Sequence, residues 1–399
     1  MTPKTNSPPR PERLVLMVGG TIGLAIVGDS FLYGTLPIEA KNLGIALPLV
    51  GILLSINRLV RLLSNTWASS VFEKLGPRRP FVLATVLALL TTAAYGAGWG
   101  FLVFLLARMG WGIAWSALRQ AGYQAVWTGG DRAKGRLMGM LWGIIRLGSA
   151  FSVLFGGFLR DRFGYRTGVW GISAITAFAI PVALSIRWPA EPRQAPRAQA
   201  SFRQGWREAL QTPPGRRLLL AGFVHSAFEG ILISTTSLFL VGRLGGSDLF
   251  PGLGAQIGTL AGFLLALRWT SDMVFGPAIG ALSDRIGQAR TLVLLATVLL
   301  ATMLGVVGLG GMSLILCLCV LFISSAGLMI TLAALASSVA LRAERPHIYV
   351  GVYATAHDAG SAVGPLLAYF ATGLIGLASQ YLLAAVILIL AIIWYRRAV

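Results

Sequence analysis

Residues 280–290 read GALSDRIGQAR and decide how this chain folds. The stretch follows a long apolar segment and brings an acid, a base and a glycine together at Asp284, Arg285 and Gly287, after a leading Gly280. Glycine permits a tight turn and a close approach of backbones, and an acid beside a base can join neighbouring helix ends. The stretch therefore predicts a short hairpin between two apolar helices, with a charge pair that can break and form again.

An equivalent hairpin occurs in the first half of the chain, where residues 70–80 read SVFEKLGPRRP. Glu73 takes the place of the acid, Lys74 that of the base and Gly76 that of the glycine, while Ser69 stands where the other copy has its leading glycine. Two copies at equivalent places indicate two similar halves, and we expect the hairpins to act as gates when the halves move against each other.

The composition shows that the hairpins connect membrane-spanning segments. Hydrophobic residues make up 56% of the 399 residues, charged residues 12%, and the mean hydropathy is +0.75. Soluble domains carry about 25% charged residues. The apolar excess runs along the whole chain, so the bilayer is the solvent for most of it.

Crossing a bilayer core of about 30 Å takes about 20 apolar residues in a helix. Segments of this kind lie at 14–37, 47–70, 81–99, 101–127, 136–158, 168–188, 217–241, 255–279, 290–309, 312–341, 348–372 and 377–395. The sequence therefore predicts an all-α membrane protein of twelve transmembrane helices in two pseudo-symmetric six-helix bundles.

The expected boundaries follow from these segments. They are an N-terminal cytoplasmic tail at 1–13, a first bundle at 14–188, a linker at 189–216, a second bundle at 217–395 and a cytoplasmic tail at 396–399. The linker is rich in Pro, Arg and Gln, and its middle, around 201–211, reads either as a short amphipathic helix on the membrane surface or as part of a flexible tether.

The net charge of +19 is explained by topology. Most of the 33 basic residues lie in the linker, the tails and the loops on the same side as the two hairpins. The positive-inside rule therefore places both termini in the cytoplasm. Affinity for anionic headgroups accounts for the basic character, and we expect no nucleic-acid partner.

Motifs for other chemistry are not found in the sequence. The three histidines show no metal-ligand spacing, and there is no P-loop, dinucleotide fingerprint or nucleophile elbow. We expect no metal, no cofactor and no enzymatic activity. A membrane enzyme acting on lipid-linked substrates is a distant alternative, which would need a cluster of His or carboxylates at one membrane face.

The repeated hairpin resembles the signature G-x-L-x-D-R-x-G-R-[KR] of the major facilitator superfamily. The second copy matches at Gly280, Leu282, Asp284, Arg285 and Gly287. The sequence RMGWG, which starts at Arg108, is similar to the family's R-x-x-x-G element and implies a place in proton coupling. The resemblance covers the whole chain and implies a secondary transporter that works by alternating access.

The spacing of glycines in two predicted helices, which we call the glycine frames, resembles a motif of proton antiporters of this family. The fifth helix of those antiporters carries G-x8-G-x3-G-P-x2-G-G. The segment at 136–158 keeps part of it and has Ser152 and Val153 in place of Gly-Pro, and the segment at 348–372 keeps another part. The matching positions are Gly139, Gly148, Gly156 and Gly157, then Gly351, Gly360, Gly364 and Pro365. The resemblance implies export by antiport, whereas close packing of small residues between helices is the alternative.

Charged side chains inside the membrane are costly and mark functional positions. Those in the predicted helices are Asp29, Glu229, Asp272 and Asp358 among the acids, with Arg58, Arg61, Arg108, Arg119, Arg146 and Arg268 among the bases. Similar depth or spacing predicts three pairs, which are Asp29–Arg58, Arg268–Asp272 and Arg146–Asp358. Structural ion pairing is as good an interpretation of these pairs as a coupling role.

Glu229 is the first candidate for the proton carrier, because only His225 lies near it in sequence. Asp29, Asp358 and Arg108 are the further coupling candidates. A cavity for substrate would be lined by arginines, which suit anionic groups, and by aromatic rings that serve packing equally well. These cavity candidates are Arg58, Arg146, Arg268, Tyr33, Trp115, Tyr123 and Trp142.

We therefore expect proton-coupled export of a small organic molecule by a monomer in a bacterial inner membrane. Uptake of an anionic metabolite together with protons is the alternative.

Overall fold

The computed structural model describes residues 11–189, 202–244, 257–340 and 346–397, and these residues contain helices and no strand. The helices are α1 (Pro11–Ala25), α2 (Val27–Glu39), α3 (Leu47–Leu75), α4 (Arg78–Ala97), α5 (Gly100–Trp127), α6 (Gly130–Phe163), α7 (Tyr165–Ala177), α8 (Ala179–Ser185), α9 (Phe202–Gln211), α10 (Pro213–Leu244), α11 (Ile257–Val274), α12 (Gly276–Ile286), α13 (Gln288–Gly308), α14 (Gly311–Ala340) and α15 (Pro346–Arg396).

Ten helical stretches of the described chain are long and apolar enough to cross a membrane. The last of them bends at Gly376, whose φ of 69° and ψ of 161° are not helical, so it makes two crossings. A further broken helix consists of α11 and α12, which meet at Phe275 just before Pro277. Proline cannot donate a hydrogen bond within a helix, which explains the break. The described residues thus make the twelve crossings predicted from the sequence, and the all-α membrane fold is confirmed.

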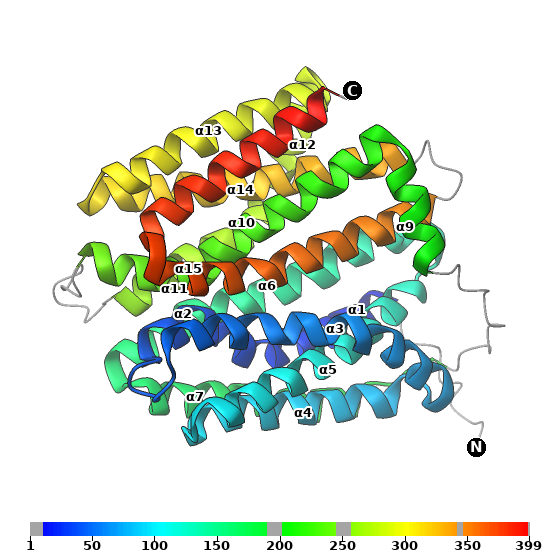
Figure 1. Cartoon of the computed structure of the whole chain (residues 1–399). Coiled ribbons are helices and arrows are strands. Elements are labelled where there is room, and N and C mark those ends of the chain that lie inside the picture. The colour runs from blue at the N-terminus through cyan, green and yellow to red at the C-terminus, as the bar shows by residue number, and fades with distance from the viewer. Residues whose placement is uncertain (1–10, 190–201, 245–256, 341–345, 398–399) are drawn as a thin grey trace, which may run out of the picture.

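The helices form two bundles that lie side by side. In Figure 1 the first bundle, α1 to α8, occupies the lower half of the view, and α10 to α15 occupy the upper half. The N- and C-terminal ends of the described chain and α9 all lie at the right-hand end of the view, which we call the termini end. We call the opposite end, which contains the turns at Gly44, Gly98 and Gly376, the loop end.

The two bundles meet along α6 and α11 on one side and along α3 and α15 on the other, with α2 against α10. Glycines allow the backbones to touch near the loop end. A Cβ at Gly157 of α6 would collide with the carbonyl of Gly258 on α11, and a Cβ at Gly51 of α3 would lie 2.7 Å from the carbonyl oxygen of Pro365 on α15. Larger residues at these two positions would force the bundles apart.

The same interface helices lack such close contacts near the termini end. Gly139 of α6 and Gly351 of α15 have no atom within 4 Å of the place that a Cβ would take. The bundles are therefore closely packed at the loop end and less closely packed at these positions near the termini end.

Both hairpins end their helices in the same way. Gly76 and Gly287 have φ values of 71° and 91°, and each donates its backbone N–H to the carbonyl four residues earlier, at Phe72 and Ser283. Side chains rarely adopt this positive φ, which accounts for glycine at both positions.

The charged members of the hairpins, Glu73, Lys74, Asp284 and Arg285, are exposed at the termini end. Their gating role remains a prediction.

The linker forms a helix where the sequence left a helix or a tether open. Helix α9 spans Phe202–Gln211 and contacts α10 and α15. Ala209 of α9 is buried, while Arg207 and Leu210 are exposed. Residues 190–201 of the linker lie outside the described residues.

Candidate functional site

A buried ion pair occupies the middle of the first bundle. The carboxylate of Asp29 on α2 accepts a hydrogen bond from Arg108 on α5, and Asn57 Nδ2 donates to the same oxygen atom over 3.3 Å. Arg108 is fully buried, and its Nε donates to the carbonyl of Leu53 over 2.8 Å. The predicted Asp29–Arg58 pair is therefore wrong. Several helices carry residues at the same membrane depth as Asp29, and Arg108 on α5 is the one whose side chain faces it.

Arg58 instead reaches the second bundle. Its guanidinium donates to the backbone carbonyl of Ser361 on α15 and lies 5.5 Å from the ring centre of Tyr33. Arg108 lies 5.7 Å from the same ring. Cations are attracted to aromatic faces at this range. Tyr33 thus connects the buried pair to an arginine that crosses the interface.

The second bundle has its own buried acid. Glu229 on α10 forms an ion pair with Arg268 on α11, and Arg268 also lies 3.0 Å from Asp272 one turn away. The predicted Arg268–Asp272 pair is confirmed. The premise that Glu229 lacks a basic partner other than a histidine is wrong, because α11 packs against α10 and points Arg268 at it.

Asp29 and Glu229 occupy equivalent places in the two bundles. Gly148 of α6 meets the carbonyl of Gly23 on the first helix, and Gly360 of α15 meets the carbonyl of Phe223 on α10. Asp29 lies six residues after Gly23, and Glu229 lies six residues after Phe223. The internal repeat therefore extends from the hairpins to the buried acids.

Two histidines converge on Glu229. One ligand atom each from His225, Glu229 and His357 lies within 4.8 Å of the others. His225 is fully buried, and His357 on α15 is partly buried. The spacing of the histidines along the chain did not reveal this cluster, because α15 contributes His357 from more than a hundred residues away.

Two further charge pairs join the bundles. Arg146 on α6 lies 3.6 Å from Asp272 on α11, and Arg119 on α5 lies 3.7 Å from Asp358 on α15. The predicted Arg146–Asp358 pair is wrong, because the repeat places these two residues at equivalent positions on opposite sides of the interface. Their side chains are 18–32% exposed, which shows that the centre of the interface is accessible.

Aromatic rings line α5 and α6 beside these charges. The ring centre of Trp115 lies 5.8 Å from that of Trp111 and 6.4 Å from that of Trp142, and both ring pairs are tilted. Trp115 is buried, whereas Tyr123 and Trp142 are partly exposed. Their contacts establish packing, and contact with substrate remains a prediction.

The glycine frames of α6 and α15 are packing surfaces in this structure. A Cβ at Gly156 would collide with Phe31, and one at Gly364 with the carbonyl of Ala227. Ser152, which replaces a glycine of the frame, donates a hydrogen bond to the carbonyl of Val27. The closely packed glycines of the frames therefore set the distance between each of these helices and its neighbour, whereas Gly139 and Gly351 make no such contact. The link of the frames to antiport stays a prediction.

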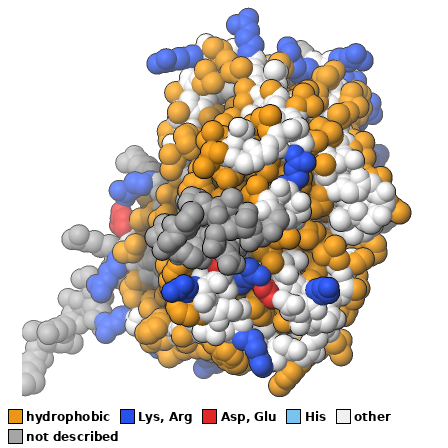
Figure 2. All heavy atoms as spheres, turned by 90° about the vertical axis from the view of Figure 1, so that its left-hand side faces the viewer, with side chains coloured by type: hydrophobic (Ala, Val, Ile, Leu, Met, Phe, Trp, Pro, Cys, Tyr) orange, Lys and Arg blue, Asp and Glu red, His pale blue; other side chains and the backbone are white. Residues whose placement is uncertain are grey.

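A polar cluster at the loop end was not predicted from the sequence. The side chain of Asp161 on α6 is fully buried and accepts hydrogen bonds from the backbone N–H of Thr259 over 2.6 Å and from its hydroxyl over 3.0 Å. Arg160 binds both Asp161 and Glu39 of α2. Acidic and basic side chains appear side by side among the apolar ones when the loop end is viewed directly (Figure 2). The cluster connects the bundles at this end.

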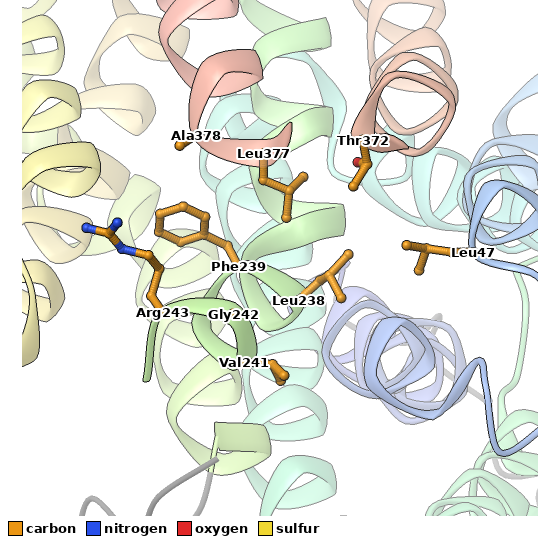
Figure 3. A pocket seen from close by; sticks show the side chains of 9 residues that line it. All are labelled: Leu47, Leu238, Phe239, Val241, Gly242, Arg243, Thr372, Leu377 and Ala378. Carbon is orange, nitrogen blue, oxygen red and sulfur yellow. The ribbon is translucent and has the colours of Figure 1, made fainter. Parts of the chain in front are cut away.

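An apolar groove also opens at the loop end (Figure 3), with a volume of about 420 Å³. Arg243, which lines the groove, donates to the carbonyls of Val307 and Leu309. The lining residues are Leu47, Leu238, Phe239, Val241, Gly242, Arg243, Thr372, Leu377 and Ala378. They include none of the predicted site residues.

Solved structures of membrane transporters share this architecture. A bacterial homologue of the human lysosomal transporter Spinster, in an inward-facing and unoccupied conformation, is 16% identical with a TM-score of 0.75, and 98% of each chain is covered. A variant of the nucleoside transporter NupG is 11% identical with a TM-score of 0.78 and coverage of 98% of this chain and 100% of that one. A variant of the Escherichia coli fucose:proton symporter FucP is 14% identical with a TM-score of 0.59, and 98% of each chain is covered.

At these identities the likeness shows the fold alone. No curated protein matches the chain in sequence. The sequence model of the Major Facilitator Superfamily, however, matches residues 18–365, which is most of the chain. The chain is a multi-pass membrane protein and belongs to the major facilitator superfamily of transporters.

Proposed function

We infer that this transporter exports a small organic molecule in exchange for protons, as a monomer in a bacterial inner membrane. The observation that carries this proposal is the set of charged contacts between the bundles at mid-membrane, Arg146–Asp272 and Arg119–Asp358, next to the buried Asp29–Arg108 pair. Charges at this depth are retained for transport or coupling. Among the similar structures, FucP is a fucose:proton symporter.

The packing supports alternating access by rocking of the two bundles. Glycine contacts and the Asp161–Thr259 hydrogen bonds hold the bundles together at the loop end, while Gly139 and Gly351 have free space around them near the termini end. The positive-inside rule assigns the termini end to the cytoplasm. With this orientation, the proposed cycle has the loop end closed to the outside, and the loop-end contacts must break to release substrate there.

Asp29 is the coupling residue that the contacts favour. A proton on Asp29 removes the negative charge that holds Arg108. Arg108 and Arg58 share the ring of Tyr33, and Arg58 binds the carbonyl of Ser361 in the other bundle. Protonation in one bundle is thereby linked to a contact across the interface. Glu229 and Asp358 remain candidates.

The alternative, uptake of an anionic metabolite with protons, is favoured by one observation. Arg58, Arg119 and Arg146 are partly exposed at the interface between the bundles. Guanidinium groups bind carboxylates and phosphates through paired hydrogen bonds. An anionic substrate would displace the acids that now neutralise Arg119 and Arg146.

Proton release from energised inside-out vesicles tests both proposals, with cationic, neutral and anionic compounds added in turn. We expect one class to trigger release, and we expect Asp29→Asn to abolish release while Glu229→Gln retains it. Exchange of labelled for unlabelled substrate, which needs no net proton movement, serves as the control that Asp29→Asn still folds and binds.

Release that is lost in Glu229→Gln and kept in Asp29→Asn would move the proton to Glu229. Absence of release with every compound, combined with accumulation of anionic metabolites in whole cells, would establish uptake in place of export.

A further inference from the structure

We propose that His225, Glu229 and His357 form a binding site for one divalent transition-metal ion of the Zn²⁺ class. The three side chains come from α10 and α15, and one ligand atom of each lies within 4.8 Å of the other two. The site lies in the middle of the second bundle and is separate from the Asp29–Arg108 pair of the first.

Hydrogen bonds fix the orientation of His225. Its Nε2 lies 3.0 Å from the backbone carbonyl of Ser325 on α14, and a carbonyl can only accept, so Nε2 carries the hydrogen. The neutral ring then has a free lone pair on Nδ1. This buried atom has no hydrogen-bond partner among the described residues.

His357 is oriented in the same manner. The hydroxyl of Ser226 donates its only hydrogen to the backbone carbonyl of His357 over 2.6 Å, so its oxygen can accept from His357 Nδ1, 3.3 Å away. This leaves the lone pair on Nε2, which is also buried without a hydrogen-bond partner in the described part of the chain.

Two imidazole nitrogens without a hydrogen-bond donor therefore belong to side chains that gather around the Glu229 carboxylate, whose one charged partner among the described residues is Arg268. Such an arrangement is unfavourable in a buried place unless a cation occupies it. Two histidines and one carboxylate are ligands that Zn²⁺ and other borderline divalent ions prefer. Ligating histidines usually donate their second N–H to a carbonyl or another polar group, as His225 does to Ser325 and His357 to Ser226.

Arg268 limits the affinity of the site without blocking it. It binds Glu229, but a carboxylate has two oxygen atoms with about four acceptor sites, and Asp272 at 3.0 Å offsets part of the arginine charge.

Titration with Co²⁺ tests the proposal, because its visible absorption reports coordination directly. The protein is purified with a histidine-free tag on a Cys317→Ala, Cys319→Ala background and stripped with a chelator. We expect one Co²⁺ per chain, displaced by Zn²⁺. His357→Ala, His225→Ala and Glu229→Gln should each weaken binding by a factor of at least about ten. His347→Ala removes the remaining histidine of the chain and should bind as before.

A variant that keeps a metal ligand separates ligation from folding. His357→Cys should retain Co²⁺ binding with the added absorption of a thiolate, whereas His357→Ala should lose it at an unchanged unfolding temperature without metal. Binding that survives His357→Ala and Glu229→Gln would overturn the proposal, as would the absence of saturable Co²⁺ binding to the parent protein.

Discussion

Arg146 on α6 lies 3.6 Å from the carboxylate of Asp272 on α11, so an ion pair joins the two bundles at mid-membrane. Arg119 and Asp358 form the second such pair, at 3.7 Å. Because rocking of the bundles changes the distance across their interface, these pairs are the contacts that a transport cycle must break and restore.

Removing both members of the Arg146–Asp272 pair should harm transport less than the sum of the single changes. Asp272→Asn alone leaves Arg146 without its partner in a partly buried site, which costs more than the pair itself contributes, whereas Arg146→Gln leaves Asp272 paired with Arg268. We expect initial transport rates of the double variant to equal or exceed those of Asp272→Asn. Strictly additive losses would show that the pair does not act as a unit.

The buried Asp29–Arg108 pair should be essential for stability. Arg108 is fully buried, and loss of its partner leaves an uncompensated charge, at a cost of about 3–5 kcal/mol in soluble proteins. We expect Asp29→Ala to lower the unfolding temperature in detergent, and Asp29→Ala with Arg108→Met to recover a large part of the loss. The measurement is thermal unfolding of the purified protein, and an unfolding temperature that Asp29→Ala leaves unchanged would contradict the prediction.

Glycines of one helix should differ sharply in their tolerance of a side chain. A Cβ at Gly157 collides with the carbonyl of Gly258 across the interface, whereas Gly139 on the same helix has open space. Gly157→Val should weaken packing at the loop end and reduce both stability and transport, while Gly139→Ala should leave both near the parent values. Equal effects of the two substitutions would argue against a loop-end interface that depends on close backbone contact.

The hydrogen bonds of Asp161 should hold the loop end closed. Its buried carboxylate binds the N–H and hydroxyl of Thr259 at the start of α11, together with Arg160. Asp161→Asn keeps the size but loses the charge, so we expect more frequent opening at this end. A cysteine at the buried Leu265 on the Cys317→Ala, Cys319→Ala background should then react faster with a thiol reagent added from the loop end. Unchanged labelling would remove Asp161 from the closing contacts.

Removing the arginine beside the proposed metal site should strengthen metal binding. Arg268 contributes a positive charge next to Glu229, and replacing it by Gln removes the repulsion of an incoming cation. We expect a lower dissociation constant for Co²⁺ in Arg268→Gln than in the parent protein. Weaker binding in this variant would indicate that Arg268 orients Glu229 rather than opposing the ion.

The amino-acid sequence by itself determined the membrane fold. Twelve apolar segments, two copies of the hairpin at Gly76 and Gly287 and the one-turn Arg268–Asp272 pair all depend on local spacing, which a helix converts directly into geometry. For the same reason the sequence identifies the charged residues of the predicted helices as candidate site residues without their partners.

Only the tertiary structure decided which charges meet. Asp29 binds Arg108 rather than Arg58, Glu229 has a partner in Arg268, and His357 joins Glu229 from a distant helix. Depth along a helix can be counted from the sequence, but the direction in which a side chain points depends on how each helix is rotated about its axis. That rotation is set by close glycine contacts between helices far apart in the chain, such as Gly148 with Gly23 and Gly360 with Phe223.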